Sequence, residues 1–177
     1  MQAAKHAKLL LAIGLLILAG GLLALTWWQF HFSTRTDFGA AISKLASMKP
    51  AEGEITIWPA DWQPQMSHLT VINLGNDAEI WRDLVVNTAK PSQQTGRVRS
   101  YPVIRLILRS GEKAAEIVED ENHFELRSNE LQCRFVSKAV AQKFWQYIGR
   151  YVRDPKQRAK FTSIRICGLP CPWADSQ

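Results

Sequence analysis

The sequence has few cysteines, glycines and prolines, and these shortages exclude several classes of protein. Three cysteines in 177 residues are too few for a small scaffold held together by disulfides. Ten glycines and eight prolines exclude a collagen-like or low-complexity chain. With 46% hydrophobic and 21% charged residues, the chain is neither wholly disordered nor a coiled-coil rod. Its length allows one domain and an appendage.

Known catalytic and nucleotide-binding motifs are also missing. The sequence has no G-x-S-x-G, H-E-x-x-H, Walker A or G-x-G-x-x-G pattern. Of its four histidines, His68 and His123 meet only if their strands pair, and a surface or strand role is the simpler interpretation of each. The net charge of +6 is modest, and no nucleic-acid-binding motif accompanies it. We therefore expect a non-enzymatic protein with no cofactor, no nucleic-acid partner and no identified small-molecule substrate.

One long apolar run stands near the N-terminus. Residues 9–28 contain no charge, and as a helix they would span about 30 Å, the thickness of the hydrocarbon core of a bilayer. The run is longer than the apolar region of a signal peptide, and a poor cleavage context follows it. Its flanks are typical of a membrane interface, with Lys5 and Lys8 before it and Trp27 and Trp28 at its end.

These features predict an uncleaved signal anchor in the inner (cell) membrane. Lys5, Lys8 and the α-amino group precede the helix, whereas Arg35 beyond it is balanced by Asp37. This bias places the N-terminus in the cytoplasm and the bulk of the chain in the periplasm. The expected parts are a cytoplasmic segment, the anchor, a stalk helix with a hinge, and an extracytoplasmic β-rich domain, over residues 1–8, 9–28, 31–53 and 54–177.

Beyond the hinge, the hydrophobic pattern alternates with a period of two, which is typical of strands. Strands without helices between them favour an antiparallel sheet over β-α-β units. The predicted strands are Glu54–Trp58, His68–Leu74, Glu79–Val86, Tyr101–Arg109, Ala114–Val118, Phe124–Arg127, Leu131–Val136 and Thr162–Cys167.

Helical spacing appears in two places, over Asp37–Met48 and over Ser137–Val152, where Ser137 is the expected N-cap. The predicted fold is therefore α+β: an N-terminal transmembrane helix, then a small antiparallel β-sandwich or sheet with one long amphipathic helix.

Charge is distributed unevenly along the domain. Residues 112–130 hold seven acidic and two basic side chains, whereas residues 131–165 hold nine basic and one acidic. Two solvated faces are the simplest interpretation, and the carboxylates of residues 119–121 then form a solvated hairpin tip. The alternative is a basic helix face that binds anionic lipid headgroups or an acidic protein. Its candidate contacts are Lys138, Lys143 and Arg153.

Three tryptophans are further candidate contacts. Trp58 and Trp62 stand close together beside Pro59 and Pro64, as in a rigid contact loop, although they could equally lie in the core. Trp145 lies beside the apolar stripe of the long helix. It either widens the buried face or contacts another subunit.

The C-terminal pair Cys167 and Cys171 is the most specific chemical pattern in the sequence. A C-x3-C pair can bind a soft cation such as Cu(I). However, only six residues follow Cys171, and the neighbouring prolines disfavour a helix that would activate a thiol. A local structural disulfide is the preferred interpretation. Cys133 is expected to be a buried thiol, with a bridge to Cys167 left open.

The sequence alone thus favours a single-pass membrane subunit or assembly factor of a multiprotein envelope complex, of secretion, transfer or respiratory type. Its partners would be other membrane proteins and the lipid bilayer. The alternative is a membrane-tethered thiol-redox or copper-handling protein that uses Cys167 and Cys171. A periplasmic module that binds a glycan or lipid is a third hypothesis, supported only by the Trp58–Trp62 segment.

Overall fold

A computed structural model describes residues 14, 17, 20–23, 38–61, 67–92, 102–119, 121–128 and 132–174 of the chain. The chain divides into two compact units, Met1–Thr36 and Asp37–Gln177. Apart from residues 14, 17 and 20–23, the predicted anchor lies outside the described residues, as do its flanks Lys5, Lys8, Trp27 and Trp28. Within the described part of the chain, no helix combines the length and the apolar character needed to cross a membrane.

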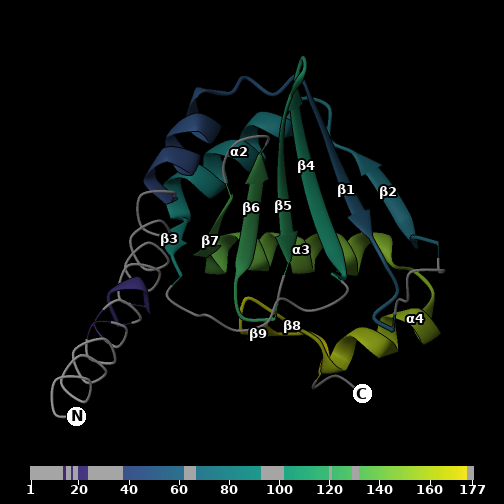
Figure 1. Ribbon diagram of the computed structural model, residues 1–177. Helices are drawn as coiled ribbons and strands as arrows, with labels where there is room; N and C mark the ends of the chain where they lie inside the picture. The colour runs from purple at the N-terminus through teal and green to yellow at the C-terminus, as the bar shows by residue number, and fades with distance from the viewer. Residues whose placement is uncertain are drawn as a thin grey trace, which may run out of the picture. The chain divides into compact units, whose positions relative to one another are not determined.

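The second unit is built on an antiparallel sheet of seven strands, which confirms the predicted α+β class. The strands are joined in the order β2-β1-β4-β5-β6-β7-β3, so they form one sheet and not a two-sheet sandwich (Figure 1). Their bounds are Glu52–Ile57 (β1), Thr70–Asn73 (β2), Lys90–Pro91 (β3), Ile104–Ser110 (β4), Lys113–Glu119 (β5), Phe124–Ser128 (β6) and Gln132–Val136 (β7).

Cross-strand register explains why the period-two pattern produces a core. Ile55 pairs with Leu106, Leu106 with Ile117, and Ile117 with Leu126. These four side chains therefore lie in one row on one face of the sheet, and all are at most 1% exposed. Because successive strand residues face opposite sides, the residues between them line the other face. We call the row's side the inner face and the opposite side the outer face.

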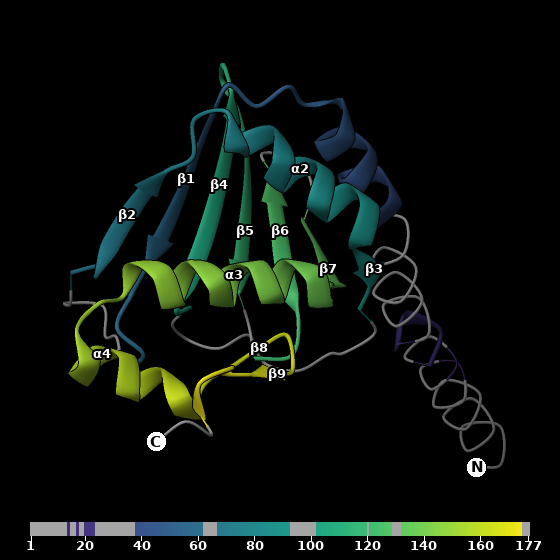
Figure 2. The same cartoon turned by 180° about the vertical axis from the view of Figure 1, so that it is seen from behind.

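Two helices cover the inner face, α2 (Asp77–Thr88) and α3 (Lys138–Tyr151) (Figure 2). Their contact centres on Trp81, whose ring centroid lies 4.8 Å from that of Phe144. Phe144 in turn lies 5.6 Å from Phe124 of the sheet. Burial of large aromatic rings on both sides fixes the two helices against the strands.

The prediction of a strand over Glu79–Val86 is wrong, because these residues belong to α2. The helix buries Ala78, Trp81 and Val85, which follow the spacing i, i+3, i+7 of a helical face. It carries the chain from β2 at one margin of the sheet to β3 at the other (Figure 2).

The long helix agrees closely with its prediction. The Ser137 hydroxyl accepts a hydrogen bond from the Val140 N–H at 3.2 Å, as expected of an N-cap. The residues that follow α3 form α4 (Pro155–Lys160), the 3₁₀ helix η1 (Phe161–Ser163) and a hairpin of β8 (Arg165–Ile166) and β9 (Leu169–Pro170). The predicted strand over Thr162–Cys167 is thus shorter than expected.

The helix over residues 38–47, in the segment expected to form the stalk, belongs to the second compact unit. Ala41, Leu45 and Met48 are buried and belong to the same hydrophobic core as the sheet. The Arg82 guanidinium also donates a hydrogen bond to the Met48 carbonyl at 2.6 Å, which ties this segment to α2.

Candidate interaction surface

The solvent side of α3 and α4 carries a concentration of positive charge. Residues 138–160 contain seven basic side chains and a single acidic one, Asp154. The carboxylate of Asp154 accepts a hydrogen bond from the Lys156 N–H at 3.0 Å, so it serves as the N-cap of α4. We define the basic helical surface by the remaining cations: Lys138, Lys143, Arg150, Arg153, Lys156 and Arg158.

None of these six side chains forms an ion pair within the described part of the chain. The seventh basic residue, Lys160, differs, because its Nζ lies 2.8 Å from Oδ2 of Asp61. This hydrogen bond lowers the pKa of Asp61 below its ordinary value. The basic helical surface therefore presents positive charge that no carboxylate of the described residues compensates.

Aromatic rings support three of the six cations. Nζ of Lys143 lies 4.8 Å from the ring centroid of Trp81, which is fully buried beneath it. The Arg158 guanidinium lies 4.7 Å from the ring of Trp173, and that of Arg150 lies 5.5 Å from the ring of Tyr151. A cation over an aromatic face is held in place without being neutralised. Lys138, Arg153 and Lys156 are exposed.

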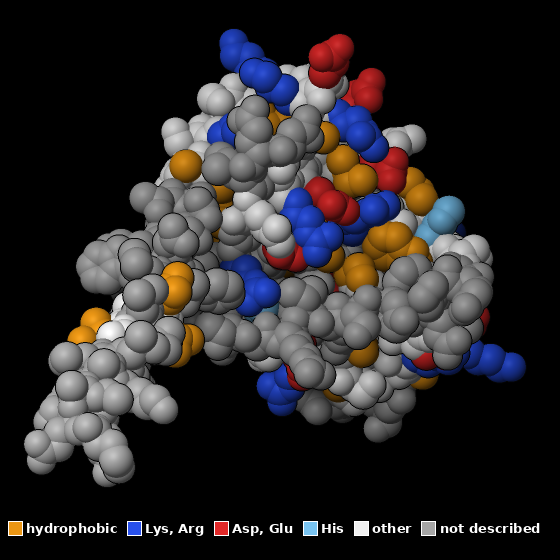
Figure 3. Space-filling view, viewed as in Figure 1, with side chains coloured by type: hydrophobic (Ala, Val, Ile, Leu, Met, Phe, Trp, Pro, Cys, Tyr) orange, Lys and Arg blue, Asp and Glu red, His pale blue; other side chains and the backbone are white. Residues whose placement is uncertain are grey.

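The outer face of the sheet differs from the basic helical surface, because its positive and negative side chains form ion pairs with one another. Arg105 of β4 pairs with Glu116 of β5 at 3.2 Å, and Arg127 pairs with Glu125 of β6 at 2.5 Å. The side-chain amide of Gln132 donates a hydrogen bond to Glu125 as well. Figure 3 shows basic and acidic side chains mixed on this face.

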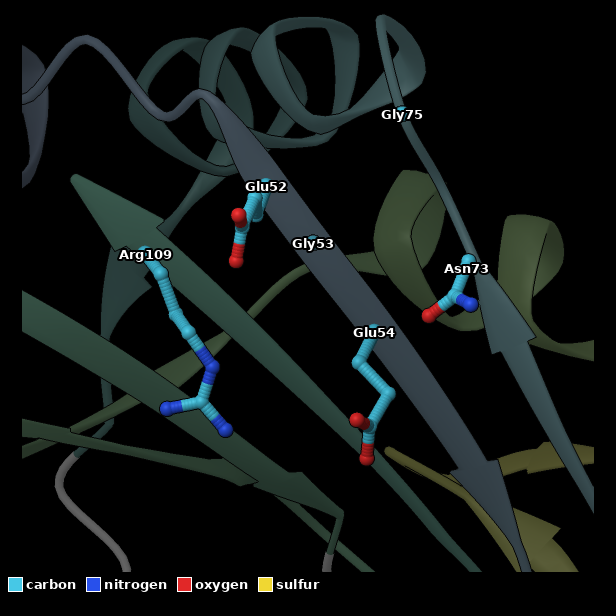
Figure 4. A pocket seen from close by; sticks show the side chains of 6 residues that line it. All are labelled: Glu52, Gly53, Glu54, Asn73, Gly75 and Arg109. Atoms are coloured by element: carbon cyan, nitrogen blue, oxygen red, sulfur yellow. The ribbon is translucent and has the colours of Figure 1, made fainter. Parts of the chain in front are cut away.

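A hollow of about 330 Å³ lies at the top of this face, over β1, β2 and β4. It is lined by Glu52, Gly53, Glu54, Asn73, Gly75 and Arg109, and Figure 4 shows two carboxylates, an amide and a guanidinium around it. The hollow is open and mixes both signs of charge. It continues the mixed character of the outer face.

The tryptophans expected at contacts have different places. Trp58 is half-buried, and the Arg105 guanidinium lies 5.0 Å from its ring centroid. Trp62 lies outside the described residues. Trp145 is only 3% exposed, and its indole N–H donates to the Leu169 carbonyl at 3.2 Å. Its ring packs edge-on against that of Trp173, with 5.5 Å between the ring centroids. Trp145 therefore links the C-terminal hairpin to α3.

The disulfide expected between Cys167 and Cys171 is absent from the structure, where both are free thiols. Ile166 pairs with Leu169, which makes Cys167 and Gly168 the two-residue turn of the hairpin. Both have positive φ, at 49° and 76°, as a type I′ turn requires. This turn directs the Cys167 thiol to the Asn122 carbonyl at 3.8 Å, while Cys171 is buried in the core.

Burial also disfavours thiol chemistry at this pair. It raises the pKa of Cys167 above the ordinary value, and the charge of Glu119 raises that pKa further. Burial likewise raises the pKa of Cys171. Metal binding and nucleophilic attack both use the thiolate, which a raised pKa makes scarcer. Among the described residues, no three His, Cys, Asp or Glu side chains are grouped to hold a metal ion. Cys133 is a buried thiol, as expected.

The hairpin tip expected to be solvated is partly buried. Glu119 is fully buried and accepts a hydrogen bond from the Val103 N–H at 2.9 Å. His123 is 1% exposed, whereas His68 is exposed. His123 directly precedes β6, and His68 lies two residues before β2. Three strands, β1, β4 and β5, separate β6 from β2, so the sheet does not bring the two histidines together.

The sequence identified Lys138, Lys143 and Arg153 as candidate contacts and missed Arg150, Lys156 and Arg158. The signal for α4 was present, because Asp154 followed by Pro155 is a typical helix start. No protein-family model, curated protein or solved structure matches this chain.

Proposed function

We propose that this chain is a non-enzymatic, single-pass membrane subunit or assembly factor of a multiprotein envelope complex. In this proposal the domain binds an acidic protein partner through the basic helical surface. The observation that carries the proposal is the set of six cations on α3 and α4 that form no ion pair with any of the described residues.

Two features favour a protein partner at this site. Uncompensated positive charge steers an acidic surface towards it and disfavours basic competitors. The rings of Tyr147 and Tyr151 stack at 5.8 Å beside Arg150, and Tyr151 is 37% exposed. Tyrosine and arginine are enriched at the centres of protein interfaces.

The membrane anchor in this proposal rests on the sequence. The uncharged run of residues 9–28, with basic residues before it and tryptophans at its end, supports one crossing with the domain outside the cytoplasm. Anchoring would keep the basic helical surface close to other proteins of the same membrane.

Charge reversal tests this function. In the full-length protein, the triple variant Lys138→Glu, Arg150→Glu and Arg153→Glu replaces three positive charges of the basic helical surface with three negative ones, which lowers its net charge by six units. The control Lys49→Glu, Lys90→Glu and Lys113→Glu makes the same change at exposed positions elsewhere. Proteins that co-purify from solubilised membranes are then quantified for both variants and for the unmodified chain.

We expect the first variant to co-purify with at least about tenfold less of a specific partner. Each 1.4 kcal/mol of lost binding free energy lowers the affinity by a factor of ten. The control should retain the partner at the unmodified level. Equal losses from both variants would show that only net charge matters, and the proposed surface would be rejected.

A further inference from the structure

The two margins of the seven-stranded sheet differ. At one margin β3 has only two residues, Lys90 and Pro91, and a charge and a proline both discourage further strand pairing. At the other margin β2 reads TVIN, with neither charge nor proline. Val71 of β2 is 41% exposed. In Figures 1 and 2, no described segment pairs with β2 on the side away from β1.

The hydrogen bonds of β2 show which backbone groups face this margin. The Leu74 N–H donates to the Gly53 carbonyl of β1 at 2.8 Å. In an antiparallel pair, every second residue bonds to the neighbouring strand, so Ile72 also bonds to β1. The N–H and C=O groups of Val71 and Asn73 therefore point away from β1. The margin offers two donors and two acceptors to a further strand.

We propose that β2 is a dimerisation edge that pairs antiparallel with β2 of a second copy of this chain, around a two-fold axis. In the register that sets Ile72 opposite the partner's Ile72, Val71 of each chain stands opposite the partner's Asn73. That register matches all the outward donors and acceptors and forms four backbone hydrogen bonds.

The composition of β2 favours a second copy as the occupant. A two-fold axis sets identical strands against each other, so any charged residue would meet its own charge nearby. The four residues of β2 are uncharged and avoid this repulsion. Ile72, which is on the inner face, gains an apolar neighbour across the axis, and Val71 loses its exposure on the outer face.

Val71→Pro is the decisive substitution, because it removes a backbone N–H that points away from β1. No bond of the β1–β2 ladder is lost, so the domain should keep its tryptophan fluorescence and circular dichroism. Val71→Thr retains the N–H and a β-branched side chain, and is the matched control. We expect sedimentation velocity of the full-length protein in detergent to show dimers for the unmodified chain and for Val71→Thr. Val71→Pro should weaken the dimer at least tenfold.

Cysteine crosslinking tests the register even if Val71→Pro does not fold. Ile72→Cys should form a disulfide-linked dimer in oxidised membranes, because residue 72 faces itself across the axis. Val71→Cys should not, because its copies are offset along the strands. The unmodified chain measures the background from its own cysteines.

The proposal would be overturned by a monomeric unmodified chain, by a Val71→Pro chain that dimerises normally, or by equal crosslinking at positions 71 and 72. It would also be overturned if the unmodified chain were a monomer bound to a different protein and Val71→Pro released that protein. The β2 edge would then bind that protein and not a second copy of the chain. Reversal of the charges on the basic helical surface should leave the dimer intact. Failure of the dimer proposal can therefore be told apart from failure of the proposed function.

Discussion

Gly53 is a residue at which the sheet and α2 approach each other closely. A Cβ atom at this position would lie 2.9 Å from Cδ1 of Leu74 and 3.0 Å from Cβ of Ala78. Leu74 can shift at its flexible end, but the Ala78 Cβ is fixed to the α2 backbone. We expect Gly53→Ala to lower the free energy of unfolding by about 1–3 kcal/mol, the usual cost of overpacking. Urea-induced unfolding, followed by tryptophan fluorescence, measures it.

Gly39 provides the control, since it lies in the helix over residues 38–47 and a Cβ there would meet no atom within 4 Å. Gly39→Ala should leave the protein equally stable or raise the free energy of unfolding by up to about 1 kcal/mol, because alanine favours helix. A Gly53→Ala protein as stable as the Gly39→Ala protein would contradict the close approach of β1 and α2.

Single-residue features were predictable where the interaction is local. The Ser137 hydroxyl caps the N–H of Val140, only three residues away, so both partners lie in one short segment of the sequence. Whether Cys167 forms a disulfide with Cys171, which it does not, could not be predicted from their spacing. It depends on the hairpin turn at Cys167 and Gly168, which directs the first thiol to Asn122, 45 residues earlier in the sequence.

At the scale of elements, α3 depends on the burial of Phe144. This side chain has no exposed surface and contacts Trp81 of α2 and Phe124 of the sheet, so it joins three elements. Phe144→Ala removes the ring and leaves a cavity among them. We expect the free energy of unfolding to fall by about 3–5 kcal/mol. Thermal unfolding should show a correspondingly lower melting temperature.

Gln142→Ala is the matched control on α3, because Gln142 is exposed and two residues away. Lys143→Ala is less suitable, since Lys143 lies over the ring of Trp81 and contributes a cation–π contact. The Gln142→Ala protein should melt within a few degrees of the unmodified protein. If Phe144→Ala were equally mild, α3 would be peripheral to the fold.

The elements that the sequence predicted correctly are those whose pattern has one interpretation. Strand β4 buries every second residue, Ile104, Leu106 and Leu108, and this period of two predicts a strand. The prediction was wrong at α2, because Ile80, Val85 and Val86 favour strands locally. The buried face of α2 depends on partners remote in sequence. Trp81 finds Phe144 and Tyr147 only once α3 is in place. Tertiary packing overrides the local preference there.

At the scale of the whole domain, the uneven charge in the sequence becomes two different surfaces. Strands β5 and β6, in the acidic segment, place Glu116 and Glu125 against Arg105 and Arg127 on the outer face. The basic segment forms α3 and α4, where the described structure gives six cations no acidic partner. The sequence predicted the imbalance. It could not predict its location, because the sheet register decides which carboxylates meet which guanidinium groups.

The proposed partner contact is tested most directly by site-specific photocrosslinking in intact membranes. A photoreactive residue at Gln146, which is exposed on α3 amid the basic helical surface, should crosslink to a specific protein with an acidic surface. The same residue at Glu112, exposed in the turn between β4 and β5, should give no such product. A specific product at Glu112 with none at Gln146 would contradict the assignment of the basic helical surface as the contact site.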